Sequence, residues 1–292
     1  MIFLVLSLLC SVLLGFIFKL YGRFGVDSFQ AIVFNYITCV LFGTWYAGRI
    51  PLGPAPGDEG LWLPYALGLG AVFITGFTTA ALTVRHFGVT VSQIMQKMSI
   101  LVTVPFALLV YHESAGWGKI SGVVMAIAAI VLVNWPKTGA ASGDATSRNG
   151  RLWIPLVTWF LAGIIEITFL WVQGEKYAAP DNVNFISTVF GTAGALGLAV
   201  ATWGWFNRRM AWSWRNVVGG IVLGIPNFGS MYFLLLALGS GLEGSFVFPV
   251  TNMGIILVTT AGALLFFHEK LSKMNWLGIV LSVLAIALMA KG

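Results

Sequence analysis

The chain has 292 residues, of which 58% are hydrophobic and only 9% are charged. A soluble domain carries about 25% charged residues, so the composition excludes an ordinary soluble enzyme and indicates an integral membrane protein. The formal net charge of +6 is not evidence for a nucleic-acid partner, because membrane proteins concentrate Lys and Arg in their cytoplasmic loops; we expect no nucleic-acid partner.

Ten apolar stretches are long enough to cross a bilayer, which takes roughly 20 residues per helix. In chain order they are predicted at residues 2–20, 29–48, 62–84, 91–111, 117–135, 152–173, 183–204, 215–237, 244–267 and 273–290. The strand-like alternation of a β-barrel is missing. The sequence therefore predicts an all-α polytopic membrane protein with ten transmembrane helices.

Two segments need a separate interpretation. Residues 2–20 lack the basic start and the small-residue cleavage site of a signal peptide, so they are interpreted as the first membrane helix. Residues 136–150 are small and polar and are predicted to form a flexible connector. Cys10 and Cys39 fall in apolar stretches, where we expect them to act as small apolar side chains.

Basic residues are distributed unevenly between the two sides of the predicted bundle. Eleven lie in the connectors after the odd-numbered helices and four lie on the opposite side; with Lys97 they account for all 16 Lys and Arg residues. This bias predicts that the odd-numbered connectors are cytoplasmic and that both termini lie outside.

The two halves of the chain resemble each other. A shift of 156 residues aligns Tyr111-His112-Glu113 with Phe267-His268-Glu269, and Gly122 with Gly278. Over 45 aligned positions from Gly88 there are 16 identities. With five helices in each half, the second copy enters the membrane from the opposite face. Residues 1–135 and 151–292 are therefore predicted to be inverted repeats, an architecture typical of secondary transporters.

These paired His-Glu motifs and the glycines that follow them resemble the EamA-type domains of the drug/metabolite transporter superfamily. That family usually has Gly-Glu where this chain has His-Glu twice. The resemblance extends over nearly the whole chain and implies a ten-helix transporter with a central site formed by helices 3, 4, 6, 8 and 9. It implies the plasma membrane, the inner membrane of a prokaryote. Family members are usually drawn with both termini in the cytoplasm, opposite to the charge bias, so the orientation stays open.

One charged residue lies deep in the predicted fourth helix. A charge at membrane depth costs at least about 2.5–3.5 kcal/mol, and Lys97 shares a helix face with Gln93 and Gln96 at i, i+3, i+4 spacing. We expect this face to line a cavity in which Lys97 binds an anionic group and the glutamines orient the solute. The alternatives are a lysine that extends to the membrane surface and a purely structural pair.

Glu166 is the acidic residue deep within a predicted span, and it is the candidate partner of Lys97. The predicted helix centres separate the two charges by roughly 11 Å in depth, which suits a zwitterionic or polar solute between them. Burial favours the neutral acid, so Glu166 is also the candidate for carrying a coupling proton. A protonated, structural Glu166 is the alternative.

Further candidates lie in the second half. Asn252 occupies the repeat position of Gln96 and Asn227 follows a helix-bending proline; each could instead bond a neighbouring helix. Trp171 and Tyr232 are candidates for stacking on a solute, whereas the tryptophans near residues 203–214 are explained by an aromatic belt at the interface. Glu113 and Glu269 are predicted to be structural, because a carboxylate at a helix end can accept hydrogen bonds from the free N–H groups that open the next helix.

The leading hypothesis is a secondary transporter of a small polar or amphipathic metabolite, amino-acid-like or related, with proton coupling as an option. There is no phosphate-binding loop, and we expect no enzyme activity, no cofactor and no metal. The expected partners are a small-molecule solute and membrane lipid, and a homodimer stays open. The alternative hypotheses are an integral membrane enzyme or lipid-modifying protein, and a non-transporting subunit.

Overall fold

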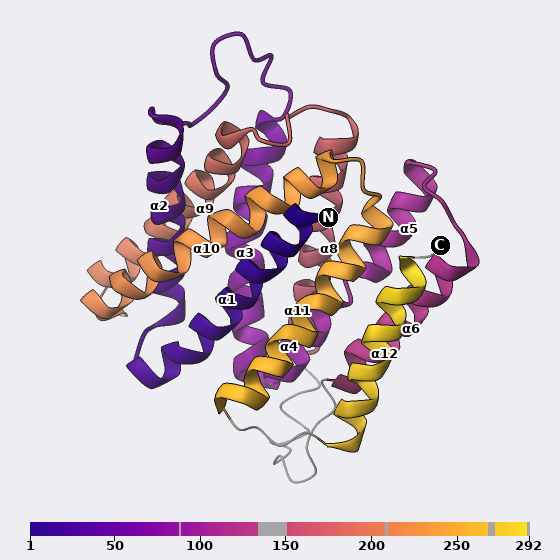
Figure 1. The fold of residues 1–292 in the computed structure, drawn as a ribbon. Coiled ribbons are helices and arrows are strands. Elements are labelled where there is room, and N and C mark those ends of the chain that lie inside the picture. The colour runs from indigo at the N-terminus through magenta and orange to yellow at the C-terminus, as the bar shows by residue number, and fades with distance from the viewer. Residues whose placement is uncertain (88, 134–150, 208–209, 268–271, 291–292) are drawn as a thin grey trace. The chain divides into compact units, whose positions relative to one another are not determined.

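The computed structural model describes residues 1–87, 89–133, 151–207, 210–267 and 272–290 (Figure 1). All regular secondary structure in these ranges is helical. The helices are α1 (Ile2–Phe24), α2 (Ser28–Ala47), α3 (Leu63–Phe87), α4 (Val89–Lys97), α5 (Ile100–Val110), α6 (Trp117–Val133), α8 (Trp153–Gly174), α9 (Val183–Phe206), α10 (Trp214–Gly239), α11 (Gly244–Phe267) and α12 (Lys273–Met289).

Length and hydropathy identify eight candidate membrane spans among the described residues. They are α1, α2, most of α3, the joined stretch Val91–Val110, α8, α9, α10 and the first part of α11. Two shorter apolar helices, α6 and α12, have 17 residues each. The protein is thus an all-helical, polytopic membrane protein, as the composition predicted.

The span predicted over residues 91–111 is confirmed as Val91–Val110, but it consists of two helices, α4 and α5, where the sequence predicted one. Met98 and Ser99 form a turn between α4 and α5. In this turn the N–H groups of Ser99, Leu101 and Val102 donate to the carbonyls three residues before them, at 3.4, 3.0 and 2.8 Å. Bonds of this spacing tighten the backbone and interrupt the α-helical ladder.

The chain folds into two compact units, and each takes helices from both sequence halves. Unit 1 contains Met1–Ile74 and Thr168–Gly241, and unit 2 contains Thr75–Ile167 and Leu242–Gly292. The predicted repeats divide the sequence at its middle, whereas each compact unit contains segments from both repeats. The predicted connector, residues 136–150, lies outside the described residues.

In unit 1, α2 packs against both α9 and α10, and α1 packs against α10. Glycine makes the α2–α10 approach possible, because a Cβ atom on Gly220 would lie 2.6 Å from the carbonyl oxygen of Ala31. Small residues at helix interfaces are the usual device for close packing in membranes. The core of this unit is aromatic, with Tyr36 stacked on Phe190 at 5.9 Å between ring centroids.

In unit 2, α6 packs along α12. The two glycines aligned by the repeat lie near opposite ends of this interface. A Cβ atom on Gly122 would lie 2.9 Å from the carbonyl oxygen of Ala285, and one on Gly278 would lie 2.4 Å from the backbone nitrogen of Val133. The start of α6 therefore meets the end of α12, and the start of α12 meets the end of α6, so the two helices are antiparallel.

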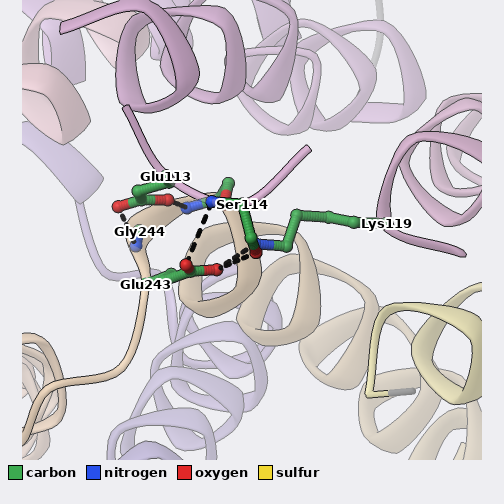
Figure 2. A network of polar contacts seen from close by, with 6 residues as sticks. Glu113, Ser114, Lys119, Glu243 and Gly244 are labelled. Atoms are coloured by element: carbon green, nitrogen blue, oxygen red, sulfur yellow. Dashed lines mark hydrogen bonds and ion pairs between the residues drawn. The ribbon is translucent and has the colours of Figure 1, made fainter. Parts of the chain in front are cut away.

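A polar network ties the α5–α6 connection to the start of α11 (Figure 2). Glu113 accepts hydrogen bonds from the N–H groups of Gly244 and Ser245, both at 2.8 Å. In the other direction, Glu243 accepts from the N–H and the hydroxyl of Ser114, at 3.1 and 2.8 Å, and forms an ion pair with the buried Lys119. We call these residues, Glu113, Ser114, Lys119, Glu243, Gly244 and Ser245, the loop clasp.

The loop clasp gives Glu113 a structural position, although the helix it caps is α11 and not α6, the next helix in the chain. The carboxylate satisfies N–H groups that have no partner inside α11 and lies at the positive end of that helix. Its repeat counterpart Glu269 lies outside the described residues.

The loop clasp should make stability depend on pH in a defined direction. Burial raises the pKa of Glu243, but the hydrogen bonds from Lys119 and Ser114 and the charge of Lys119 outweigh it and hold the pKa below its ordinary value. A carboxyl whose pKa falls on folding stabilises the protein above its unfolded pKa, and this contribution is lost as the pH falls through the folded pKa.

We therefore expect Glu243→Gln to lower the thermal unfolding midpoint at pH 7, and to lose this effect once the pH is below the folded pKa of Glu243. Scanning fluorimetry of the detergent-purified protein from pH 7 to pH 3 measures it. Glu59→Gln, in an exposed loop, is the control and should change the midpoint little at either pH. If Glu243→Gln lowered the unfolding midpoint equally at pH 7 and pH 3, the prediction would be contradicted.

Candidate functional site

The turn between α4 and α5 places two opposite helix ends inside one membrane span. Lys97 is the last residue of α4, where the partial negative charge of the helix end favours a cation. Ser99 precedes the first residue of α5, where the partial positive charge favours an anion. A broken span thus creates a place for both signs of charge that a continuous helix does not offer.

From this position the Lys97 side chain contacts α11. Its Nζ donates a hydrogen bond to the Asn252 Oδ1 at 3.0 Å. Asn252 is 5% exposed, whereas the Lys97 side chain is only partly buried. Within the described part of the chain this is the hydrogen bond that the Lys97 ammonium makes, and an ammonium has three donors. Two N–H groups therefore remain for which no described residue provides an acceptor.

Glu166 of α8 lies on the other side of Asn252. The Asn252 Nδ2 donates to the Glu166 Oε1 at 3.4 Å, and the Thr103 hydroxyl of α5 donates to the Glu166 Oε2 at 2.6 Å. The amide of Asn252 turns its oxygen toward the ammonium and its nitrogen toward the carboxylate. Its dipole is thus favourably oriented for both charges.

Four side chains from four helices, Lys97, Asn252, Glu166 and Thr103, therefore form one network, which we call the polar quartet. All four belong to unit 2. Lys97 and Glu166 form no direct ion pair in the described residues; one amide group separates them. The sequence predicted roughly 11 Å of depth between the two charges; in the structure both groups bond the same amide, that of Asn252.

Neighbouring contacts fix the helices that carry the polar quartet. The Trp159 indole of α8 donates to the Met98 carbonyl at 3.0 Å, within the turn itself. One residue earlier on α8, the hydroxyls of Thr158 and Thr83 are 2.9 Å apart. The Ser92 hydroxyl of α4 donates to the Ala80 carbonyl of α3 at 3.1 Å. These contacts hold α3, α4 and α8 together around the turn.

The two predicted glutamines do not join the polar quartet. Both Gln93 and Gln96 are exposed. The Gln96 Nε2 donates to the Ser92 hydroxyl at 3.2 Å, and no hydrogen bond from either glutamine to Lys97 is present in the described residues. Their expected role in orienting a solute stays a prediction.

The remaining predicted residues lie in unit 1 with partners of their own. Asn227 donates to the Asn35 Oδ1 at 3.1 Å. The hydroxyls of Tyr232 and Tyr46 are 3.2 Å apart. The Trp171 indole donates to the Tyr65 hydroxyl at 3.3 Å. For Asn227 this contact is the structural alternative that the sequence left open; the stacking roles of Tyr232 and Trp171 stay predictions.

Thr103 is the member of the polar quartet that sequence reasoning missed. Six residues after Lys97, it would lie roughly 120° away from it around an unbroken helix, so periodicity gave no reason to pair them. The turn at Met98 and Ser99 changes this relation. The signal in the sequence was the repeated ILVT segment, Ile100 to Thr103, which indicated a repeat but no site.

Replacement of Asn252 tests whether the amide stabilises both charges. We expect Asn252→Leu to lower the free energy of unfolding by about 1.5–3 kcal/mol, the value of a hydrogen bond to a charged group. Unfolding by denaturant in detergent micelles measures it. Asn227→Leu is the matched control, since Asn227 bonds a neutral amide and should cost only about 0.5–1.5 kcal/mol. Equal costs would show that the charges are not held by Asn252.

Comparisons with known proteins place the chain among relatives. No protein-family model matches the sequence. A crystal structure of another protein has the same fold, with a TM-score of 0.76 at 13% identity, over 98% of this chain and 94% of the other. A protein of Haemophilus influenzae described as uncharacterized is 31% identical over 295 aligned residues, covering 97% of this chain and 95% of its own length. The chain belongs to the same family as this Haemophilus influenzae protein.

Proposed function

We propose that the protein is a secondary transporter that moves a small polar or amphipathic metabolite, amino-acid-like or related, across the plasma membrane by alternating access. The observation that carries the proposal is the polar quartet at a break within a membrane span. Secondary transporters bind their solutes at broken helices near the bilayer midplane. Ionisable side chains inside a span are rare and mostly functional.

The repeat supports the same proposal. Gly122 and Gly278, which the sequence repeat aligns, lie near opposite ends of the interface between α6 and α12. Two helices equivalent by sequence that run antiparallel are what an inverted repeat requires. On this basis α6 and α12 complete a set of ten spans, five in each half, with the bilayer thinned or the helix ends extended to match their length.

The resemblance of the His-Glu motifs to EamA-type domains adds support from the sequence. It favours a plasma-membrane protein, in a prokaryote the inner membrane, that acts on a small solute. The polar quartet contributes one ammonium and one carboxyl group, so the solute we expect carries at least one charged or strongly polar group.

Transport into vesicles tests the proposal. The purified chain is reconstituted into phospholipid vesicles and offered radiolabelled amino acids, monocarboxylates, nucleosides, sugars and quaternary ammonium compounds. We expect saturable uptake of one class and exchange of labelled for unlabelled solute of that class. Vesicles without protein are the control.

No protein-dependent uptake or exchange of any class would overturn the proposal. A hydrolytic or transferase activity on lipid, found with the same vesicles, would favour the membrane-enzyme alternative.

A further inference from the structure

We propose that Glu166, Thr103 and the Ser99 carbonyl form a proton switch, and that the transported solute is a monoanion, bound through a carboxylate at Lys97 and carried together with one proton. The inference rests on the proposed transport function and adds a solute class and a coupling to it. The central group is the Thr103 hydroxyl, which has two possible hydrogen-bond acceptors.

The Thr103 hydroxyl is within hydrogen-bond distance of two oxygens. It lies 2.6 Å from the Glu166 Oε2 and 3.1 Å from the Ser99 carbonyl oxygen. A hydroxyl has one proton to donate and lone pairs to accept, so it can serve only one of these acceptors at a time. Thr103 itself is fully buried.

Two complete hydrogen-bond arrangements follow. When Glu166 is ionised, Thr103 donates to the carboxylate, at the short distance typical of a charge-assisted bond. When Glu166 takes a proton from water, an O–H bond forms at Oε2 and that group donates to the Thr103 oxygen. Thr103 then rotates its own proton toward the Ser99 carbonyl. In both states the Glu166 carboxyl group, the Thr103 hydroxyl and the Ser99 carbonyl each keep a hydrogen-bond partner.

The charge of the polar quartet decides which solute fits each state. With Glu166 ionised, Lys97 and Glu166 sum to zero; with Glu166 protonated, the network carries one positive charge. A bound monoanion restores neutrality only in the protonated state. A net charge at membrane depth is expensive, so the favoured states are empty and deprotonated, or protonated with the anion bound.

The free hydrogen-bond donors of Lys97 favour the same class of solute, a monoanion. Its ammonium has two N–H groups that no described residue accepts, and they match the oxygens of a carboxylate. A dianion such as phosphate would leave a net negative charge even after Glu166 is protonated. A cation would compete with Lys97 for the same acceptors.

Among the described side chains of the helices around the polar quartet, the remaining titratable groups lie toward the helix ends. These helices are α3, α4, α5 and α11, and the charge on them that is nearest to Glu166 is Lys97. The other charged or titratable groups described on them or next to them are Tyr65, His86, Tyr111, His112, Glu113 and Glu243. His86 pairs with Arg151 at 3.0 Å, and Arg151 lies roughly 22 Å along α8 from Glu166. Glu113 and Glu243 are each about 14–15 Å along their helices from Thr103 and Asn252.

Binding and proton uptake should be linked reciprocally. We expect each bound monocarboxylate to bring about one proton with it when Glu166 is ionised beforehand. The affinity should then fall by up to tenfold for each pH unit of increase.

Calorimetry on the full chain in detergent tests this. Lactate, benzoate and N-acetylglycine are the probes, with inorganic phosphate and choline for comparison, at pH 6, 7 and 8. Each titration is repeated in two buffers of different ionisation enthalpy, which gives the number of protons bound. We expect one or more of the monocarboxylates to bind with proton uptake. Choline should bind more weakly at every pH, and phosphate should bind more weakly at pH 8, where it is mainly a dianion.

Two variants separate the switch from a structural role. Glu166→Gln imitates the protonated acid, and should bind the monocarboxylate with no proton uptake and no dependence on pH. Thr103→Val removes the donor to the ionised carboxylate, so the midpoint of the pH dependence should move upward, and Thr103→Ser should restore it. A purely structural Thr103 would change stability but not this midpoint.

Several results would overturn the inference while the proposed function stands. They are transport of a neutral or cationic solute with no binding of the monocarboxylates, a pH dependence that persists in Glu166→Gln, binding lost in a folded Glu166→Gln, or an unchanged midpoint in a folded Thr103→Val. Failure of all solute classes to enter vesicles would instead remove the transport function itself.

Discussion

Replacing Lys97 by Met is expected to reduce solute affinity and uptake at least 100-fold, because it removes the one ammonium of the polar quartet. Loss of a charge-assisted hydrogen bond to a bound anion accounts for about 1.5–3 kcal/mol, which is roughly a factor of 10 to 150. Loss of the charge that balances the anion inside the membrane adds to this. Initial rates of uptake into vesicles and calorimetric affinities measure the effect.

The variant should still fold. Met has a side chain of similar length and flexibility, and Glu166 keeps its hydrogen bond from Thr103. Gln93→Leu is the matched control, since Gln93 is on the same helix, is exposed and makes no hydrogen bond to the polar quartet in the described residues. Normal transport by Lys97→Met, or equal losses in both variants, would show that Lys97 is not the anion-binding group.

A large effect on stability is also expected at Gly278, where α12 meets the end of α6. A Cβ atom there would lie 2.4 Å from the backbone nitrogen of Val133, and backbone cannot move aside as a flexible side chain can. Overpacking of this kind costs about 1–3 kcal/mol. We expect Gly278→Ala to lower the free energy of unfolding by that amount and Gly278→Val to lower it further.

Gly68→Ala is the control for this experiment, because a Cβ atom on Gly68 would meet nothing within 4 Å. In a helix interior, alanine is favoured over glycine by roughly 0.5–1 kcal/mol, so this variant should be neutral or slightly more stable. Gly122→Ala should be intermediate, since its nearest contact is the flexible side chain of Met289 at 2.5 Å. If Gly278→Ala is as stable as the parent protein, α6 and α12 do not approach each other as closely as described.

The fold was predictable because each apolar run was long and ended in turn residues. Residues 244–267 were predicted as a helix and α11 is Gly244–Phe267, while residues 29–48 were predicted and α2 is Ser28–Ala47. The start of α2 is also of a type that sequence indicates, because Asp is a preferred N-cap residue. In the structure the Asp27 carboxylate accepts a hydrogen bond from the Gln30 N–H at 2.9 Å. Hydropathy measures only the cost of placing side chains in lipid, and this cost decides which segments become membrane helices.

The site was less predictable because it depends on backbone detail. Hydropathy does not distinguish a continuous span from one with a turn at Met98 and Ser99, and only the turn brings Thr103 next to Glu166. Asn252 was predicted by its repeat position as a solute ligand, yet its contact with both charges depends on the packing of α11. Asn227 was predicted from its place after a helix-bending proline, and Tyr232 and Trp171 as aromatic groups that could stack on a solute. Their partners on neighbouring helices could not be inferred from one sequence.

The loop clasp also has a consequence for the order of events during synthesis. Glu113 and the N–H of Gly244 that it binds are 131 residues apart in the chain. At a translation rate of 5–20 residues per second, Glu113 waits roughly 7–26 s for this partner to leave the ribosome. During that interval its carboxylate has only water and lipid headgroups around it. In a nascent chain stalled before residue 244, the turn that carries Glu113 therefore lacks these hydrogen bonds. The synthesis of α11 is the step that provides them.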